Sequence, residues 1–246
     1  MKVEAISKGV LFDYAEITPS SSRIELFKGS DRVQEKFGPV TSINESEITS
    51  WLLQKESTRS LIFEELNIPE AAKAQVEVQK PFIRDVNSKP GDIDILICNP
   101  HNPTNSIAIE CKRVKVKPET FSTGQIGGLK SVRKGVEQVN ALAEKYSFAH
   151  VYLMVIVQVN GKERDNFNQF FRGTTDKQKE RIYSVPLDQG INAKVGIIFL
   201  EIIQVTNRPF EKNGYVGLSL PKLASKRKQL SDLSELLEKY FKENIN

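Results

Sequence analysis

Two short stretches decide the fold: Gly91-Asp-Ile-Asp-Ile-Leu-Ile97 and, after a loop, Ile107-Ala-Ile-Glu-Cys-Lys112. Both are apolar runs of strand length that carry charged residues. Side chains two apart in a strand point to the same face, so Glu110 and Lys112 are expected to project together. If the two strands pair antiparallel, Asp94 from the first can reach the same point. Charged groups inside an apolar sheet are costly unless they pair or bind a metal, so the pattern predicts a functional site.

The predicted site holds the parts that phosphodiester hydrolysis needs. Two carboxylates can bind a divalent cation, which polarises a phosphate and lowers the pKa of a bound water. A lysine ammonium can orient that water or stabilise charge that develops in the transition state. With only two cysteines and two histidines in the chain, the expected metal is a hard cation, Mg²⁺ or Mn²⁺, rather than zinc. Cys98 and Cys111 lie in apolar runs and are predicted to be buried thiols.

These residues resemble the pattern of the PD-(D/E)xK nucleases, which include restriction endonucleases and Holliday-junction resolvases. The shared features are G-x-I-D before an apolar run and a second apolar run ending in E-x-K, within residues 45–160. The resemblance implies a metal-dependent endonuclease or exonuclease that hydrolyses nucleic acid, with DNA favoured over RNA. It makes Asp94 and Glu110 metal ligands, the carbonyl of Cys111 a further ligand, and Lys112 the catalytic lysine.

The proline of the family motif is missing here, which leaves a choice between Asp92 and Asp94 for the first ligand. We prefer Asp94 because it leads directly into the apolar strand, whereas Asp92 lies in a turn, where Asp is common for backbone reasons.

The family often adds a glutamate from the preceding helix. The candidates are Glu47, Glu56, Glu64 and Glu65. Glu47 is favoured because helical spacing places it at the edge of a stripe formed by Ile48, Trp51 and Leu52. The alternative is that Glu47 only completes a capping box with Asn44; Ser42 with Glu45 fits the same motif.

The helix predicted from Leu129 to Tyr146 carries candidate nucleic-acid contacts. Some family members have a glutamine on this helix, and Gln138 takes that place. Lys130, Arg133 and Lys134 form a basic face that could contact phosphates, although a solvated helix face is an equally good explanation. The net charge of +4 permits a polyanionic partner without requiring one.

The expected fold is α/β, a restriction-endonuclease-like mixed central β-sheet flanked by helices, with an αβββαβ core. Two nearly all-apolar strands, at 151–159 and 195–205, are typical of a sheet covered on both faces, and the polar segment between them is expected to be an excursion or loop. Further strands are predicted at 76–83, 93–98 and 107–114. The chain is divided into a β-rich N-terminal extension (1–40), a nuclease-like core (41–210) and a C-terminal amphipathic helix (211–246).

The composition is that of a soluble globular protein, with 39% hydrophobic and 27% charged residues. We expect neither a signal peptide nor a membrane span, and therefore a cytoplasmic protein without a membrane partner. The family implies a role such as phage defence or repair, with a homodimer or a partner protein left open. The alternative is a catalytically silent nucleic-acid-binding or scaffold module on the same fold within a larger complex.

Overall fold

A seven-stranded mixed sheet forms the centre of the computed structural model, which describes residues 7–12, 24–28, 32–36, 40–78, 93–160, 172–204 and 214–244. The strand order is β1-β9-β8-β7-β6-β5-β4. The three strands β6, β7 and β8 run parallel, and the other neighbouring pairs are antiparallel. The strands are β1 (Ser7–Phe12), β4 (Lys73–Val78), β5 (Ile93–Asn99), β6 (Asn102–Val116), β7 (His150–Val159), β8 (Gly196–Gln204) and β9 (Gly214–Lys222).

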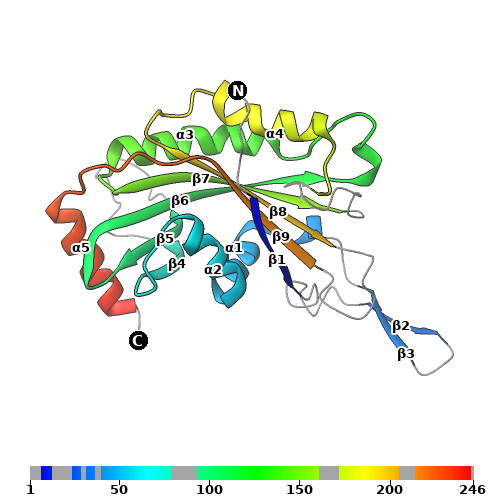
Figure 1. The fold of residues 1–246 in the computed structure, drawn as a ribbon, viewed down its shortest axis with the longest axis horizontal. Coiled ribbons are helices and arrows are strands. Elements are labelled where there is room, and N and C mark those ends of the chain that lie inside the picture. The colour runs from blue at the N-terminus through cyan, green and yellow to red at the C-terminus, as the bar shows by residue number, and fades with distance from the viewer. Residues whose placement is uncertain are drawn as a thin grey trace.

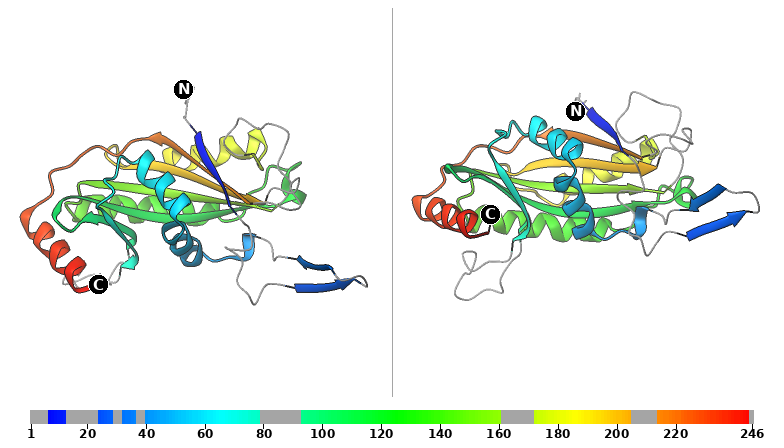
Figure 2. Two further views of the ribbon diagram at one scale, coloured as in Figure 1. Left: turned by 60° about the horizontal axis from the view of Figure 1, so that its bottom comes forward. Right: turned by 90° about the horizontal axis from the view of Figure 1, so that it is seen from below.

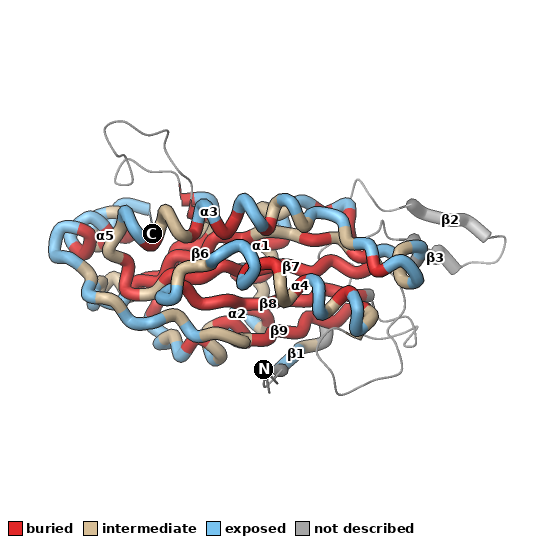
Figure 3. The backbone as a smooth tube through the Cα atoms, turned by 90° about the horizontal axis from the view of Figure 1, so that it is seen from above, coloured by how far each residue is buried: buried red, intermediate tan, exposed pale blue. Residues whose placement is uncertain are grey.

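Helices cover both faces of this sheet (Figure 1). On one face lie α1 (Glu45–Gln54) and α2 (Glu56–Glu65), and on the other lie α3 (Leu129–Lys145) and α4 (Asp176–Asp188). The C-terminal helix α5 (Ser231–Asn244) packs its apolar residues into the core on the α3 side. Figure 2 shows the two helical layers from other directions, and Figure 3 shows that the central strands are buried almost throughout. The predicted α/β class, with a mixed sheet flanked by helices, is confirmed.

Local sequence explains why these elements form. Helix α1 begins with a capping box in which Asn44 accepts the Glu47 N–H at 2.8 Å and the Glu47 carboxylate accepts the Asn44 N–H at 3.0 Å. Helix α3 buries the residues that helical spacing selected, among them Val132, Val136 and Val139. Strand β7 is apolar along nearly its whole length because both of its faces are covered. Cys98 and Cys111 are buried free thiols, as predicted.

The structure corrects the sequence analysis in the C-terminal half. Residues Asp176–Asp188 form α4, so the prediction of a loop between the two apolar strands is wrong for this part. The capping box that Thr175 forms with Gln178 is a sequence signal for this helix. The apolar face of the helix is small, since the buried apolar residues are Ile182, Val185 and Pro186. The segment assigned to a C-terminal helix also contains strand β9.

The division into an N-terminal extension and a core does not follow the sheet. Strand β1 pairs with β9 in register from Ser7↔Ser219 to Phe12↔Gly214 and so belongs to the central sheet. Only β2 (Ile24–Lys28) and β3 (Arg32–Lys36) form a separate two-stranded sheet. The predicted strand residues 79–83 and Asp92 lie outside the described residues. None of the described helices is long and apolar enough to cross a membrane.

A glycine turn joins β6 to the start of α3. The Lys115 N–H donates to the Gly127 carbonyl at 2.8 Å, and the Gly127 N–H donates back to Lys115 at 2.9 Å. The next residue, Gly128, has φ of 89°, in the left-handed region that favours glycine. A Cβ at Gly128 would lie 2.6 Å from the Arg113 carbonyl oxygen. Both the conformation and the close approach therefore require glycine here.

We expect Gly128→Ala to destabilise the protein more than Gly190→Ala, which serves as a matched control. Gly190 also has a positive φ, 70°, but nothing lies within 4 Å of a Cβ built there. Gly190→Ala should lower the free energy of unfolding by about 1–2 kcal/mol through backbone strain alone. Gly128→Ala should cost at least about 1 kcal/mol more, because the added methyl meets backbone atoms that cannot move cheaply. Urea denaturation measures both, and equal losses would contradict the close approach.

Candidate active site

The site forms where β5 and β6 separate. Their last paired residues at this end are Ile95 and Ile109, and Asp94 and Glu110 come one residue beyond. From there β6 continues with β7 on one side, and on the other side the described residues pair with it only at the Lys115–Gly127 bridge. The backbone N–H groups along this open edge need acceptors.

Carboxylates supply two of those acceptors. The Cys111 N–H donates to Asp94 Oδ2 at 2.6 Å. The backbone amide of Arg113, two residues further along the same edge, hydrogen-bonds to the carboxylate of Glu45. These two bonds hold a side chain from β5 and one from α1 against β6. The open edge therefore gathers the acidic groups.

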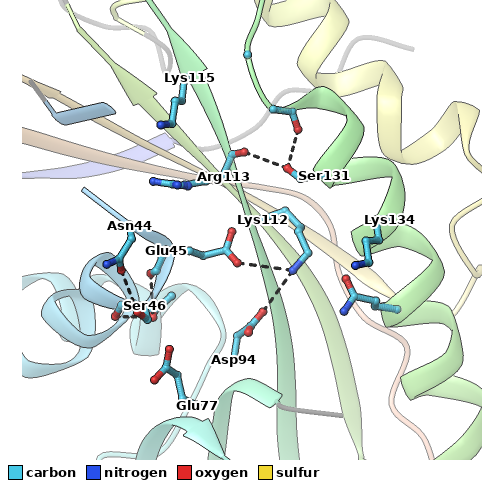
Figure 4. Close-up of a pocket in the computed structure, with 14 residues that line it drawn as sticks. Asn44, Glu45, Ser46, Glu77, Asp94, Lys112, Arg113, Lys115, Ser131 and Lys134 are labelled. Carbon is cyan, nitrogen blue, oxygen red and sulfur yellow. Dashed lines mark hydrogen bonds and ion pairs between the residues drawn. The ribbon is translucent and has the colours of Figure 1, made fainter. Parts of the chain in front are cut away.

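Lys112 lies at the centre of three carboxylates. Its Nζ is 2.5 Å from Glu110 Oε1, 3.6 Å from Glu45 Oε1 and 3.8 Å from Asp94 Oδ2, and it also donates to the Cys111 carbonyl at 2.6 Å. Figure 4 shows Glu45, on α1, and Asp94, on β5, directed at Lys112 from two sides. The structure thus brings together Asp94, Glu110 and Lys112, the three residues that the sequence pattern selected.

Burial and like charges perturb the titration of this cluster. Glu110 is only 4% exposed, and burial, followed by the negative charge of Asp94, raises its pKa to about 7 despite the opposing effect of Lys112. Burial, together with Asp94, also raises the pKa of Glu45. For Lys112, burial acts to lower the pKa, but the surrounding carboxylates outweigh it and raise the pKa above its ordinary value. Lys112 therefore carries its charge at neutral pH.

Glycine on α3 makes room for the lysine. A Cβ at Gly135 would lie 2.5 Å from Lys112 Cγ and 3.3 Å from Leu153 Cδ1. Gly135 is buried in the second turn of the helix, where glycine costs helix stability relative to alanine. The close packing of the Lys112 side chain against α3 explains why residue 135 is a glycine.

The helix glutamate at the site is Glu45, not the predicted Glu47. Glu47 is exposed, and its carboxylate accepts the N–H of Asn44 in the capping box. Glu64 and Glu65 approach Lys8 of β1 instead, at 3.8 and 2.9 Å, and Glu56 is exposed at the start of α2. A signal for Glu45 was present, because it precedes Ile48 and Leu52 by three and seven residues and so shares their buried stripe.

The acidic cluster opens into a pocket of about 710 Å³. Asp94, Glu45 and Lys112 line it, whereas Glu110 is buried and contacts the site through Lys112. Of the predicted nucleic-acid contacts, Lys134 and Gln138 line the pocket and Lys130 and Arg133 do not. Three further charged residues line the pocket that sequence analysis did not select: Glu77, Arg113 and Lys115. Glu77 has φ of 48°, an uncommon conformation for a residue other than glycine.

The donor set has the chemistry of a site for a hard dication. Among the described residues no three His, Cys, Asp or Glu side chains converge closely enough to hold a metal. The Lys112 ammonium takes up the space between the carboxylates and bonds both Glu110 and the Cys111 carbonyl. One ammonium nevertheless faces three carboxylates, and the pKa values of Glu45 and Glu110 are raised by burial first and then by the negative charge of Asp94. Oxygen donors with excess negative charge suit Mg²⁺ or Mn²⁺.

Comparison with protein-family models and with curated protein sequences finds no match to this chain. The resemblance to PD-(D/E)xK nucleases therefore stays a prediction.

Metal binding should depend on pH near neutrality, because Glu110 must lose its proton to become a ligand. We expect Mg²⁺ or Mn²⁺ to raise the melting temperature of the protein more at pH 8 than at pH 6, on either side of its pKa of about 7. Without metal, the contribution of Glu110 to the free energy of unfolding should fall as the pH rises from 4.5 to about 7, because this carboxyl ionises at lower pH in the unfolded chain than in the folded protein.

Differential scanning fluorimetry with and without metal measures these shifts. Glu110→Gln is the control: it should remove the pH dependence of the metal effect. A metal-induced shift of equal size at both pH values in the wild type would contradict the assignment.

Proposed function

We propose that this chain is a Mg²⁺- or Mn²⁺-dependent nuclease with a restriction-endonuclease-like fold that hydrolyses phosphodiester bonds of nucleic acid, with DNA favoured. The observation that carries the proposal is the convergence of Glu45, Asp94, Glu110 and Lys112 at the open edge of β6, beside a pocket. The element order supports it, since α1 and α2, the strands β4 to β6, helix α3 and strand β7 follow one another as the resemblance implies.

In this proposal Asp94, Glu110 and Glu45 hold the metal together with the Cys111 carbonyl. The bound ion supplies a Lewis acid for the phosphate and lowers the pKa of a water molecule. Lys112 must leave Glu110 and the Cys111 carbonyl to free these donors. Asp94 is already held in place by the Cys111 N–H, so one ligand is positioned before any ion arrives.

The ammonium of Lys112 suits it to a stabilising role. In the absence of a metal the carboxylates around it raise its pKa, so it is protonated at neutral pH and can donate hydrogen bonds to the attacking water or to a phosphate oxygen. In this proposal Glu45 and Glu110 would be metal ligands, and a bound cation lowers the pKa of a carboxylate that it binds, so the proton that the water loses would pass to solvent rather than to either of them. Lys112 then stabilises the charge that develops on the phosphate.

A catalytically silent nucleic-acid-binding module is the second candidate. The contacts of Lys112 favour this candidate, because its ammonium pairs with Glu110 and donates a hydrogen bond to the Cys111 carbonyl. In the described part of the chain, no three His, Cys, Asp or Glu side chains are grouped closely enough to hold a metal. Membership of a defence or repair system, with a second copy or another protein, belongs to either candidate.

Cleavage of plasmid and single-stranded DNA in Mg²⁺, Mn²⁺ or EDTA tests the proposal. We expect metal-dependent cleavage by the wild type and a loss of at least about 100-fold in Lys112→Ala, because one group that stabilises the transition state is gone. Asp94→Asn should lose cleavage similarly while retaining an oxygen acceptor for the Cys111 N–H. Lys117→Ala is the control, since this exposed lysine of the same segment pairs with Glu119, away from the acidic cluster, and should keep full activity.

Full activity in a folded Lys112→Ala protein would refute the mechanism. An absence of both cleavage and metal-induced stabilisation in the wild type would favour the silent module.

A comparison of Glu45→Gln with Glu47→Gln tests which helix residue belongs to the site. Both substitutions remove one negative charge from the first turn of α1, so their electrostatic effects on the helix are alike. Glu45→Gln should reduce metal-dependent cleavage at least about 10-fold and weaken metal-induced stabilisation, because it removes a ligand. Glu47→Gln should retain both, since glutamine also completes a capping box. If Glu47→Gln lost cleavage and metal-induced stabilisation while Glu45→Gln kept both, Glu47 would be the ligand, as first predicted.

A further inference from the structure

Two lysines border the pocket that holds the acidic cluster, one on each side of β6 (Figure 4). Lys115 lies on β6 and Lys134 on α3, and both line the same pocket as Asp94 and Lys112 (Figure 4). Neither has an ion-pair partner among the described residues, unlike Lys112 and Lys117. We propose that Lys115 and Lys134 form a subsite in which each contacts a backbone phosphate of one bound nucleic-acid strand, beside the phosphate held at the acidic cluster. The inference rests on the proposed function and assigns it a substrate contact.

The position of Lys115 is fixed by the backbone. Two hydrogen bonds tie its main chain to Gly127, which places the lysine beside the turn that begins α3. Three residues separate it from Lys112, or roughly 10 Å along a strand at about 3.3 Å per residue. Lys115 is therefore too far to join the acidic cluster and near enough to contact the same bound strand.

Lys115 also lies in a locally positive environment. Burial, and then the charges of Arg113 and Lys117, lower its pKa. Arg113 and Lys115 alternate on β6, and Lys117 follows the end of the strand. Lys117 pairs with Glu119 and Arg113 interacts with Glu45, whereas no ion-pair partner of Lys115 is found among the described residues. An anion bound at Lys115 would relieve this repulsion.

Helix α3 contributes the other half of the subsite. Lys134 and Gln138 are four residues apart and thus lie on one face of the helix, and both line the pocket. Gly128, the N-cap of the helix, and Ser131 in its first turn also line the pocket, so the positive end of the helix dipole lies at the pocket. Gly135, next to Lys134, packs against Lys112. One helix therefore positions a phosphate contact and borders the catalytic lysine.

The chemistry of the lining favours phosphates over bases. None of the described residues that line the pocket is aromatic, so the pocket offers no ring on which a base could stack. Lysines contact backbone phosphates without regard to sequence. The ligand that fits is a strand with consecutive phosphates, not a free mononucleotide.

Binding of a labelled oligonucleotide in EDTA, as a single strand and as a duplex, tests the subsite at several salt concentrations. The variant Lys115→Gln/Lys134→Gln is compared with Lys130→Gln/Arg133→Gln, which also removes two positive charges but lies outside the pocket. We expect at least about 10-fold weaker binding for the first variant. Its slope of log affinity against log salt should fall by at least about 0.7, which corresponds to one phosphate contact. The control variant should change binding less than about 3-fold, as expected for charges outside the contact surface.

The outcomes distinguish a failure of the proposed phosphate subsite from a failure of the proposed nuclease activity. Equal losses in the two double variants, an unchanged salt slope in the pocket variant, or full competition by a mononucleotide would overturn the subsite. Metal-dependent cleavage by the wild type, measured in parallel, would then still support the nuclease. Selective loss of binding in the pocket variant, with no cleavage by the wild type, would support the subsite and refute the nuclease. Failure of the wild type to bind either oligonucleotide would overturn the subsite.

Discussion

Beyond Ile109, strand β6 continues without β5, and its outward N–H groups must find acceptors other than a neighbouring strand. Asp94 accepts from Cys111, Glu45 from Arg113, and the Gly127 carbonyl from Lys115. These three N–H groups are two residues apart, so they point from the same edge. Each fixes a different element to β6: the start of β5, the start of α1 and the turn before α3. The arrangement of the candidate site follows from this one open edge.

The charges that this edge gathers are not balanced. Lys112 lies 2.5 Å from Glu110, yet the pKa of Glu110 is still raised to about 7, because burial and the negative charge of Asp94 outweigh the ion pair. A buried ion pair in this situation contributes little to stability. Side chains that cost free energy in the folded state and converge beside a pocket are better explained by function than by folding. In the proposed nuclease a dication would add positive charge to this cluster.

The sequence predicted those residues of the site whose placement depends on local periodicity. Asp94, Glu110 and Lys112 stood out because two-residue alternation placed charges among buried apolar neighbours. Glu45 did not, since it lies in a first turn where acids are common for capping, and Glu47 fits the same motif. The role of Lys115 depends on a bridge to Gly127, a contact that no local pattern reveals. The pairing of β1 with β9 is likewise non-local, joining residues about two hundred positions apart.

Two glycines link the acidic and basic sides of the pocket. Gly128 lets the start of α3 approach the backbone of β6 at Arg113, and Gly135 lets the stem of Lys112 pack against the same helix. Protein interiors are close-packed, so a shift of α3 would move Lys134 and the space around Lys112 together. The position of Lys134 at the pocket and the packing of the Lys112 stem therefore depend on the same contact between α3 and β6, and both glycines are needed for that contact.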